Sequence, residues 1–363
     1  MASLDDLPLR DDLRGKKAYG APMVPVRYAL NVNENTHPVP DSVRSAILES
    51  LGHALENINR YPDREFTVLR ESLATYASES HQGDEITPDM VWAANGSNEV
   101  LQHVLQAFGG PGRSLLGFPP TYSMHPIIAE STGTTWIPGR RNEDFTLSTE
   151  SVVADIETHH PDLVFFCAPN NPTGTPVSVD TIAAAYEATS GVVLVDEAYV
   201  EFLPEGTLTA SQLLPGRERL VVSRTMSKAF AFAGARVGYL LADPAVIDAM
   251  RLVRLPYHLS ALTQAAAVAA LAHRATMLTM VADIRAQRDR LLAELPKLGY
   301  PVAYSDANFV LFGGVADPHA TFESLLEHDI LVRDVGIPHH LRVTAGTTEE
   351  TSYFLETLAK LSA

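Results

Sequence analysis

The chain has a single cysteine, little positive charge and no long apolar run, and each shortage argues against a class of protein. Cys167 cannot form a disulfide within the chain, so it is expected to be a small buried hydrophobe and nothing indicates an oxidising compartment. The 363 residues include 27 Lys and Arg against 44 Asp and Glu, a net charge of −17, which argues against nucleic acid or an anionic membrane as a partner. The longest apolar stretch, near 265–272, is far shorter than a membrane span, and the N-terminus lacks the apolar core of a secretory signal. We therefore expect a soluble cytoplasmic protein.

The length and the 46% hydrophobic content suffice for a large core with two domains. Residues 1–26 carry charges, Gly and Pro and are predicted to form an N-terminal arm. We expect a large domain over 41–255 and a smaller α+β domain from 27–40 and 256–363. The large domain should begin with a helix over 41–55, capped by Asp41 or Ser42.

The centre of the chain alternates short apolar strands, at 163–167, 191–195 and 220–222, with helical segments. This alternation is typical of a mostly parallel sheet covered on both faces, an α/β fold. Polar groups follow each strand: Asn170-Asn171, then Asp196 to Tyr199, then Ser223 to Lys228. Because ligands bind at the carboxyl ends of parallel strands, we expect these groups to meet in one site.

Lys228 is the candidate nucleophile of that site. It stands among small and hydroxylated residues, and Arg236 follows eight residues later. Desolvation lowers the pKa of a buried lysine, so its amine could form a Schiff base with an aldehyde cofactor. Arg236 could clamp an anionic group of that cofactor. Taken alone, the stretch is more typical of a surface lysine in a loop rich in Gly and Ala.

Two further segments are candidates for ligand contacts. Residues 95–99 join an expected strand at 90–94 to a helix, and the free N–H groups at such a helix start attract anions. An ordinary capped helix start would look the same. Tyr122 follows a strand end, where its ring could stack on a flat ligand or belong to the core.

Taken together, these motifs resemble the fold type I pyridoxal-phosphate aminotransferases over nearly the whole chain. The resemblance rests on Asn171-Pro-Thr-Gly174, Asp196-x-x-Tyr199, Ser227-Lys228 and Arg236, in that order. Further stretches, among them 9–15, 19–22, 92–99, 120–126 and 332–336, most resemble the histidinol-phosphate aminotransferases, particularly actinobacterial forms. The resemblance implies a large domain that binds pyridoxal 5'-phosphate on a mostly parallel seven-stranded sheet, with a smaller α+β domain beside it.

The resemblance also implies a role for each matching residue around the cofactor ring. Lys228 would hold the cofactor as a Schiff base and later move the substrate proton. Asp196 would face the pyridine nitrogen, and Tyr199 and Asn171 would bond the phenolic oxygen. Tyr122 would stack on the ring.

The cofactor phosphate would be bound by a second group of residues, namely Gly96, Ser97, Asn98, Thr225, Ser227 and Arg236. In relatives the tyrosine that matches Tyr61 reaches this phosphate from the other subunit, which implies a homodimer with shared active sites. His37, His339 and His340 lack metal-ligand spacing with a partner, so they receive no role, and no metal site is expected.

The resemblance implies transamination of L-histidinol phosphate with 2-oxoglutarate, giving imidazole acetol phosphate and L-glutamate, in histidine biosynthesis. Arg342 would take the glutamate carboxylate, and the other candidates for substrate binding are Tyr19, Asn33, Tyr257 and Arg333. For Arg333 a structural ion pair remains an alternative.

Thr36-His37 departs from the family pattern near the substrate entrance, and this departure motivates an alternative, an aromatic amino acid aminotransferase. A phosphothreonine-type decarboxylase and a non-catalytic PLP-binding regulator are further alternatives.

Overall fold

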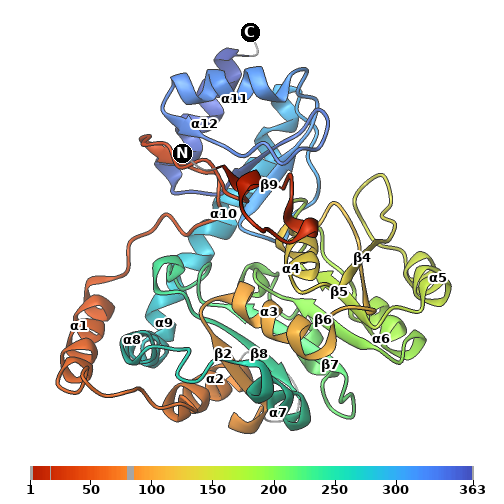
Figure 1. Cartoon of the computed structure of the whole chain (residues 1–363). Coiled ribbons are helices and arrows are strands. Elements are labelled where there is room, and N and C mark those ends of the chain that lie inside the picture. The colour runs from red at the N-terminus through yellow and green to blue at the C-terminus, as the bar shows by residue number, and fades with distance from the viewer. Residues whose placement is uncertain (1–2, 17, 80–85, 362–363) are drawn as a thin grey trace.

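The protein consists of a large lobe and a small lobe joined by a long helix, seen in a computed structural model that describes residues 3–16, 18–79 and 86–361 (Figure 1). The large lobe surrounds the main sheet. The arm and the C-terminal helix α12 (Thr348–Leu361) lie in or beside the small lobe, so chain segments far apart in sequence meet there.

The main sheet has seven strands, and the three strands that are followed by the predicted site residues are neighbours in it. From one edge to the other it runs β2 (Val91–Ala94), β8 (Gly238–Ala242), β7 (Leu220–Thr225), β6 (Val192–Asp196), β5 (Leu163–Cys167), β3 (Ser114–Gly117) and β4 (Thr135–Pro138). β8 is antiparallel to both of its neighbours, and the other pairings in this sheet are parallel. The predicted mostly parallel seven-stranded sheet is confirmed.

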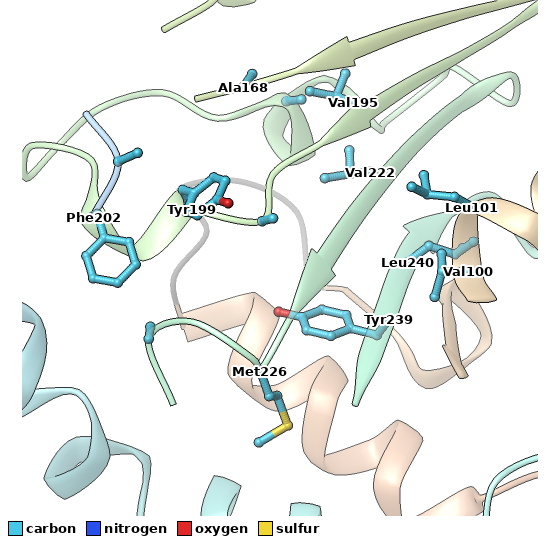
Figure 2. Close-up of a cluster of buried hydrophobic side chains, with 14 of the residues drawn as sticks. Val100, Leu101, Ala168, Val195, Tyr199, Phe202, Val222, Met226, Tyr239 and Leu240 are labelled. Atoms are coloured by element: carbon cyan, nitrogen blue, oxygen red, sulfur yellow. The ribbon is translucent and has the colours of Figure 1, made fainter. Parts of the chain in front are cut away.

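The central strands are fully buried because their sequences are nearly continuous runs of Val, Leu and Phe. Val195 and Val222 belong to the same core as Val100 and Leu101 of helix α3 (Ser97–Phe108) (Figure 2). The strand register sets Cys167 beside Asp196, and Asp196 beside Ser223. The ends of three strands therefore stand level at one edge of the sheet, as the sequence predicts.

The other helices of the large lobe are α1 (Asp41–Leu55), α2 (Thr67–Glu79), α4 (Met124–Ser131), α5 (Thr149–His159), α6 (Val179–Ala188) and α7 (Pro244–Val253). The predicted span of α1 is confirmed, but its predicted cap is wrong. Pro40 occupies the N-cap position, and no side chain there accepts a cap hydrogen bond. A proline at this point sets an extended backbone that leads directly into the helix.

The small lobe contains two short sheets and the helices beside them. β1 (Tyr28–Ala29) pairs with β10 (Ile330–Leu331), and β9 (Phe309–Phe312) pairs with β11 (Leu341–Thr344). Three helices accompany them: α10 (Thr279–Glu294), α11 (Pro318–Glu327) and α12. α10 contacts β9 and α12 of the small lobe and the turn at Val200–Phe202 of the large lobe.

Two helices near the predicted domain boundary lie with the large lobe. α8 (Ala261–Ala272) packs against α1 and α2, and the short α9 (Arg274–Met277) connects it to α10 (Figure 1). The domain limits at 40/41 and 255/256 stay a prediction. Across the described ranges no single helix is long and apolar enough to cross a membrane, and the one adjoining pair that meets this test, Ala261–Ala272 with Arg274–Leu298, is bent by 81°.

Candidate active site

A cavity of about 640 Å³ opens at the carboxyl edge of the main sheet. Residues of both lobes and of the arm line it, so it lies where the two lobes meet. Most residues predicted for the site line this cavity: Tyr19, Asn33, Ser97, Asn98, Tyr122, Asn171, Asp196, Tyr199, Thr225, Ser227, Lys228, Arg236, Arg333 and Arg342. Segments separated by more than 300 residues are thus brought into one site.

Lys228 follows β7, and the pKa of its amine is lowered. Its Nζ donates a hydrogen bond to the carbonyl oxygen of Val32, 3.0 Å away. Burial, and next the positive charge of Arg342, lower the pKa of Lys228 from 10.5 to about 8. A substantial fraction of the amine is therefore neutral near pH 8, and a neutral amine is a nucleophile and a proton acceptor.

Asp196, at the end of β6, has one occupied and one available carboxylate oxygen. Its Oδ2 lies 3.3 Å from Nε2 of His125, and the two side chains are almost fully buried. Oδ1 is also buried and has no hydrogen-bond partner within the described part of the chain. Because Asp196 lines the cavity, this oxygen is available to a donor on a bound ligand.

His125 is a site residue that the sequence analysis did not identify. It lies on α4, and its ring meets Tyr122 edge-on at 5.6 Å between centroids. The spacing Tyr122-x-x-His125 places both rings on one turn, which is the only signal that the sequence offers. The contact with Asp196, 71 residues away, comes from the fold.

Tyr199 is held by two amides. Its hydroxyl oxygen accepts hydrogen bonds from Nδ2 of Asn33 at 3.0 Å and Nδ2 of Asn171 at 3.3 Å. Burial raises the pKa of Tyr199, so the phenol keeps its proton at neutral pH. With both amides donating to it, the hydroxyl can donate that proton to a ligand in the cavity.

The start of α3 and the loop after β7 form a cradle for an anion. Gly96 is the N-cap of α3, with φ +87° and ψ 166°. A Cβ atom there would lie 2.3 Å from Nη2 of Arg236, so only glycine lets the guanidinium approach this closely. Thr225 donates to Ser227 at 3.0 Å, and both line the cavity. Helix N–H groups, hydroxyls and one guanidinium therefore converge.

Two arginines of the small lobe line another part of the cavity. Arg333 and Arg342 pair through their backbones as an isolated β-bridge. Arg342 donates to the side-chain oxygen of Asn171 and, at 2.7 Å, to the carbonyl of Asn31. Burial lowers the pKa of Arg342 to about 10, and the group stays charged at neutral pH.

Tyr61 and Tyr257 lie outside the cavity lining of their own chain. Their rings stack on each other at 4.5 Å between centroids, and Tyr61 is 81% exposed. The expected contact of Tyr61 with a cofactor phosphate requires a second copy of the chain, and it stays a prediction. The expected substrate contact of Tyr257 also stays a prediction.

Several residues that line the cavity were not predicted to belong to the site, Val32 and Cys167 among them. Val32 contributes only its carbonyl oxygen, to which Lys228 donates, so no side-chain pattern could reveal it. Cys167 is buried as predicted, but its Sγ also accepts the N–H of Asn171 at 3.3 Å and lines the cavity.

Comparison with known proteins assigns the family. Residues 28–358 match the model of the family described as aminotransferase class I and II. The chain is 57% identical over 361 residues to a histidinol-phosphate aminotransferase of Paenarthrobacter aurescens, covering 99% of this chain and 96% of the relative. It is 53% identical over 356 residues to one of Thermobifida fusca, covering 98% and 96%.

A solved structure shows the same fold. The crystal structure of histidinol-phosphate aminotransferase from Sinorhizobium meliloti in complex with pyridoxal-5'-phosphate superposes with a TM-score of 0.83 at 22% identity, covering 93% of this chain and 91% of that one. The fold, the converging site and the sequence identity agree: the chain belongs to the class I and II aminotransferases and, within them, to the histidinol-phosphate aminotransferase family.

Proposed function

We propose that this protein transfers the amino group of L-histidinol phosphate to 2-oxoglutarate with the help of pyridoxal 5'-phosphate, a step of histidine biosynthesis. The observation that carries the proposal is the single cavity that combines Lys228, Asp196 and an anion cradle with two arginines of the small lobe. The relatives named above, more than half identical over almost the whole chain, support the choice of substrate.

The residues fit the cofactor. The available Oδ1 of Asp196 suits a ring N–H, and a carboxylate there favours the protonated ring. The cradle of Gly96, Ser97 and Arg236 suits a phosphate, and Tyr122 offers a ring face. When bound, pyridoxal 5'-phosphate supplies an aldehyde that exchanges amines and a ring that takes up electrons.

The remaining cofactor contacts follow from the predicted residues. We assign the ring hydroxyl to Tyr199 and Asn171, because the Tyr199 hydroxyl keeps its proton and Asn171 lies beside it. We assign further phosphate contacts to Asn98, Thr225 and Ser227, which line the same cavity.

Lys228 acts as the proton carrier. With its pKa near 8, the amine would accept the proton from the substrate carbon that bears the amino group and would return it to the cofactor carbon on the other side of that nitrogen. A group with its pKa near the working pH serves as both acid and base, which a transfer in two directions requires.

The two arginines account for two different anions. Histidinol phosphate carries a phosphate and no carboxylate, whereas glutamate and 2-oxoglutarate carry two carboxylates. Arg342 and Arg333 would bind these groups in turn, since a guanidinium pairs with both carboxylate and phosphate. Tyr19 and Asn33, which line the same cavity, complete the proposed substrate contacts.

Steady-state kinetics test the substrate. We expect a kcat/KM for histidinol phosphate with 2-oxoglutarate that exceeds the value for phenylalanine by at least about a hundredfold, because phenylalanine lacks the phosphate and leaves the polar groups that would bind it unpaired. Phenylalanine is the relevant competitor because Thr36-His37 replaces the usual family residues near the site entrance. A preference for phenylalanine would overturn the proposal in favour of an aromatic amino acid aminotransferase.

We further propose a homodimer with shared sites. Tyr61 is exposed and does not line the cavity of its own chain. Together with Tyr257, on which its ring stacks, it is available for contact with a second copy of the chain. Inactive Lys228→Ala and Tyr61→Ala proteins, mixed and allowed to exchange subunits, should regain part of the activity, because one mixed site contains both native residues. Failure of exchanged mixtures to regain activity would contradict sharing.

The division into a cofactor-binding domain over 41–255 and a small domain from 27–40 and 256–363 remains our proposal. It is supported by the main sheet, whose strands all fall between Val91 and Ala242. The cytoplasmic location expected from the sequence also stays a prediction.

A further inference from the structure

A second cavity, of about 400 Å³, lies between the turn that follows Tyr199 and the first turns of α10. It shares no lining residue with the active-site cavity. Its size falls within the range of cavities that take small molecules. None of the residues assigned above to the cofactor or the substrate lines it.

Glu201 lines this second cavity and has one buried carboxylate oxygen without a partner in the described part of the chain. Its Oε1 accepts a hydrogen bond from the hydroxyl of Tyr76 at 3.1 Å. Its Oε2 is buried and, among the residues that the structure describes, has no hydrogen-bond partner. A buried acceptor without a partner costs free energy, so a donor that reached this oxygen would be bound favourably.

Arg285 presents the complementary group from α10. Its Nη2 donates to the carbonyl oxygens of Glu201, at 3.3 Å, and of Leu203, which fixes the guanidinium at the cavity. Its Nε is buried and, like Oε2 of Glu201, finds no partner in the described part of the chain. Two charged residues that line the cavity therefore have an available hydrogen-bonding atom. The Glu201 carboxylate has an acceptor, and the Arg285 guanidinium has a donor.

Two other charged residues line the cavity. The positive charge of Arg224 acts on Glu201, but its guanidinium is paired with Glu197 at 2.8 Å, and both of these side chains are almost fully buried. Glu205 is exposed. The remaining lining is largely apolar and includes Leu203, Pro204, Leu278, Val281 and Ala282.

We propose that this second cavity binds an α-amino acid in its zwitterionic form. The ammonium group would donate to Oε2 of Glu201, the carboxylate would accept from Nε of Arg285, and the side chain would lie on the apolar wall. A simple amine or a simple carboxylic acid would satisfy only one of the two groups and leave the other unpaired.

The ionisation of Glu201 agrees with this pairing. Burial raises the pKa of Glu201 to about 7, so the carboxyl is partly protonated at neutral pH when it is alone. An ammonium group beside it would favour the charged form. The inference does not depend on the proposed reaction, because the two cavities are separate.

Isothermal titration calorimetry tests the second site on the holoenzyme after reduction with borohydride, which fixes the cofactor on Lys228 and prevents amine exchange. Each proteinogenic α-amino acid is titrated in turn. We expect at least one to bind with one site per chain, and its amide and its N-acetyl derivative to bind at least tenfold more weakly.

Substitutions show in which of the two cavities the amino acid binds. Glu201→Gln and Arg285→Lys should each weaken it at least tenfold, whereas Arg342→Gln, in the active-site cavity, should leave it unchanged. Ala282→Leu is the fold-neutral check, because Ala282 is exposed and lines the cavity, so a larger side chain there narrows the cavity and leaves both charged groups in place. Absence of binding, or binding that Ala282→Leu leaves intact or that Arg342→Gln abolishes, would overturn the proposal.

Discussion

Replacing Gly96 by alanine tests the anion cradle at its narrowest point. Gly96 has φ +87° and ψ 166°, a backbone region that only glycine occupies readily and that costs other residues about 1–3 kcal/mol. The new Cβ would also lie 2.3 Å from Nη2 and 2.9 Å from Cζ of Arg236. Both distances are too short for non-bonded atoms, so the guanidinium must move away.

The size of the effect follows from what Arg236 loses. A hydrogen bond to a charged group contributes about 1.5–3 kcal/mol, and each 1.4 kcal/mol is tenfold in affinity. The Kd for pyridoxal 5'-phosphate should therefore rise roughly 10- to 100-fold in Gly96→Ala. Titration of the apoenzyme with the cofactor, followed by protein fluorescence, measures it directly.

Gly234→Ala is the matched control. Gly234 lines the same cavity, and a Cβ there would meet nothing within 4 Å. This variant should bind the cofactor as the native protein does. If Gly96→Ala bound it as tightly as Gly234→Ala, the assignment of the cradle to the cofactor phosphate would be refuted.

Three further predictions concern Lys228 and two buried pairs. Because burial lowers the pKa of Lys228 to about 8, attachment of the cofactor to the apoenzyme should accelerate roughly tenfold per pH unit below pH 8 and level off above it; a midpoint near 10 would contradict this. His125→Phe leaves Oδ2 of Asp196 without its partner and should lower kcat about tenfold or more, with a smaller loss in His125→Gln; equal kcat values would argue against a positioning role. Arg224→Met leaves Glu197 buried and unpaired and should lower the free energy of unfolding by about 3–5 kcal/mol in urea titrations; a loss below about 1 kcal/mol would show that the pair is unimportant.

The sequence predicted those parts of the fold that local patterns encode. The continuous apolar runs of β5, β6 and β7 identified the sheet centre, and the polar residues after them identified the site. β4 was not predicted because Thr135–Pro138 is a short edge strand that is only partly buried. β8 was not predicted either, and its antiparallel direction could not be, since strand direction depends on the path of the chain between strands and not on the composition of the strand.

Site residues could be predicted only where the type of side chain indicates a chemical role. Lys228, Asp196 and Arg236 do so, and they line one cavity. The Val32 carbonyl could not be foreseen, because every residue carries one. His125 lacks a sequence signal beyond its spacing from Tyr122, and its partner became evident only when the fold brought α4 against the end of β6.

One single-turnover experiment tests the central claim most directly. The holoenzyme is mixed with L-histidinol phosphate without 2-oxoglutarate, and the absorbance of the bound cofactor is followed as it takes up the amino group. We predict rapid loss of the yellow form with histidinol phosphate, slow loss with phenylalanine and none in Lys228→Ala. A holoenzyme that stays yellow with histidinol phosphate but reacts with another amine would contradict the proposed substrate while leaving the fold and the role of Lys228 intact.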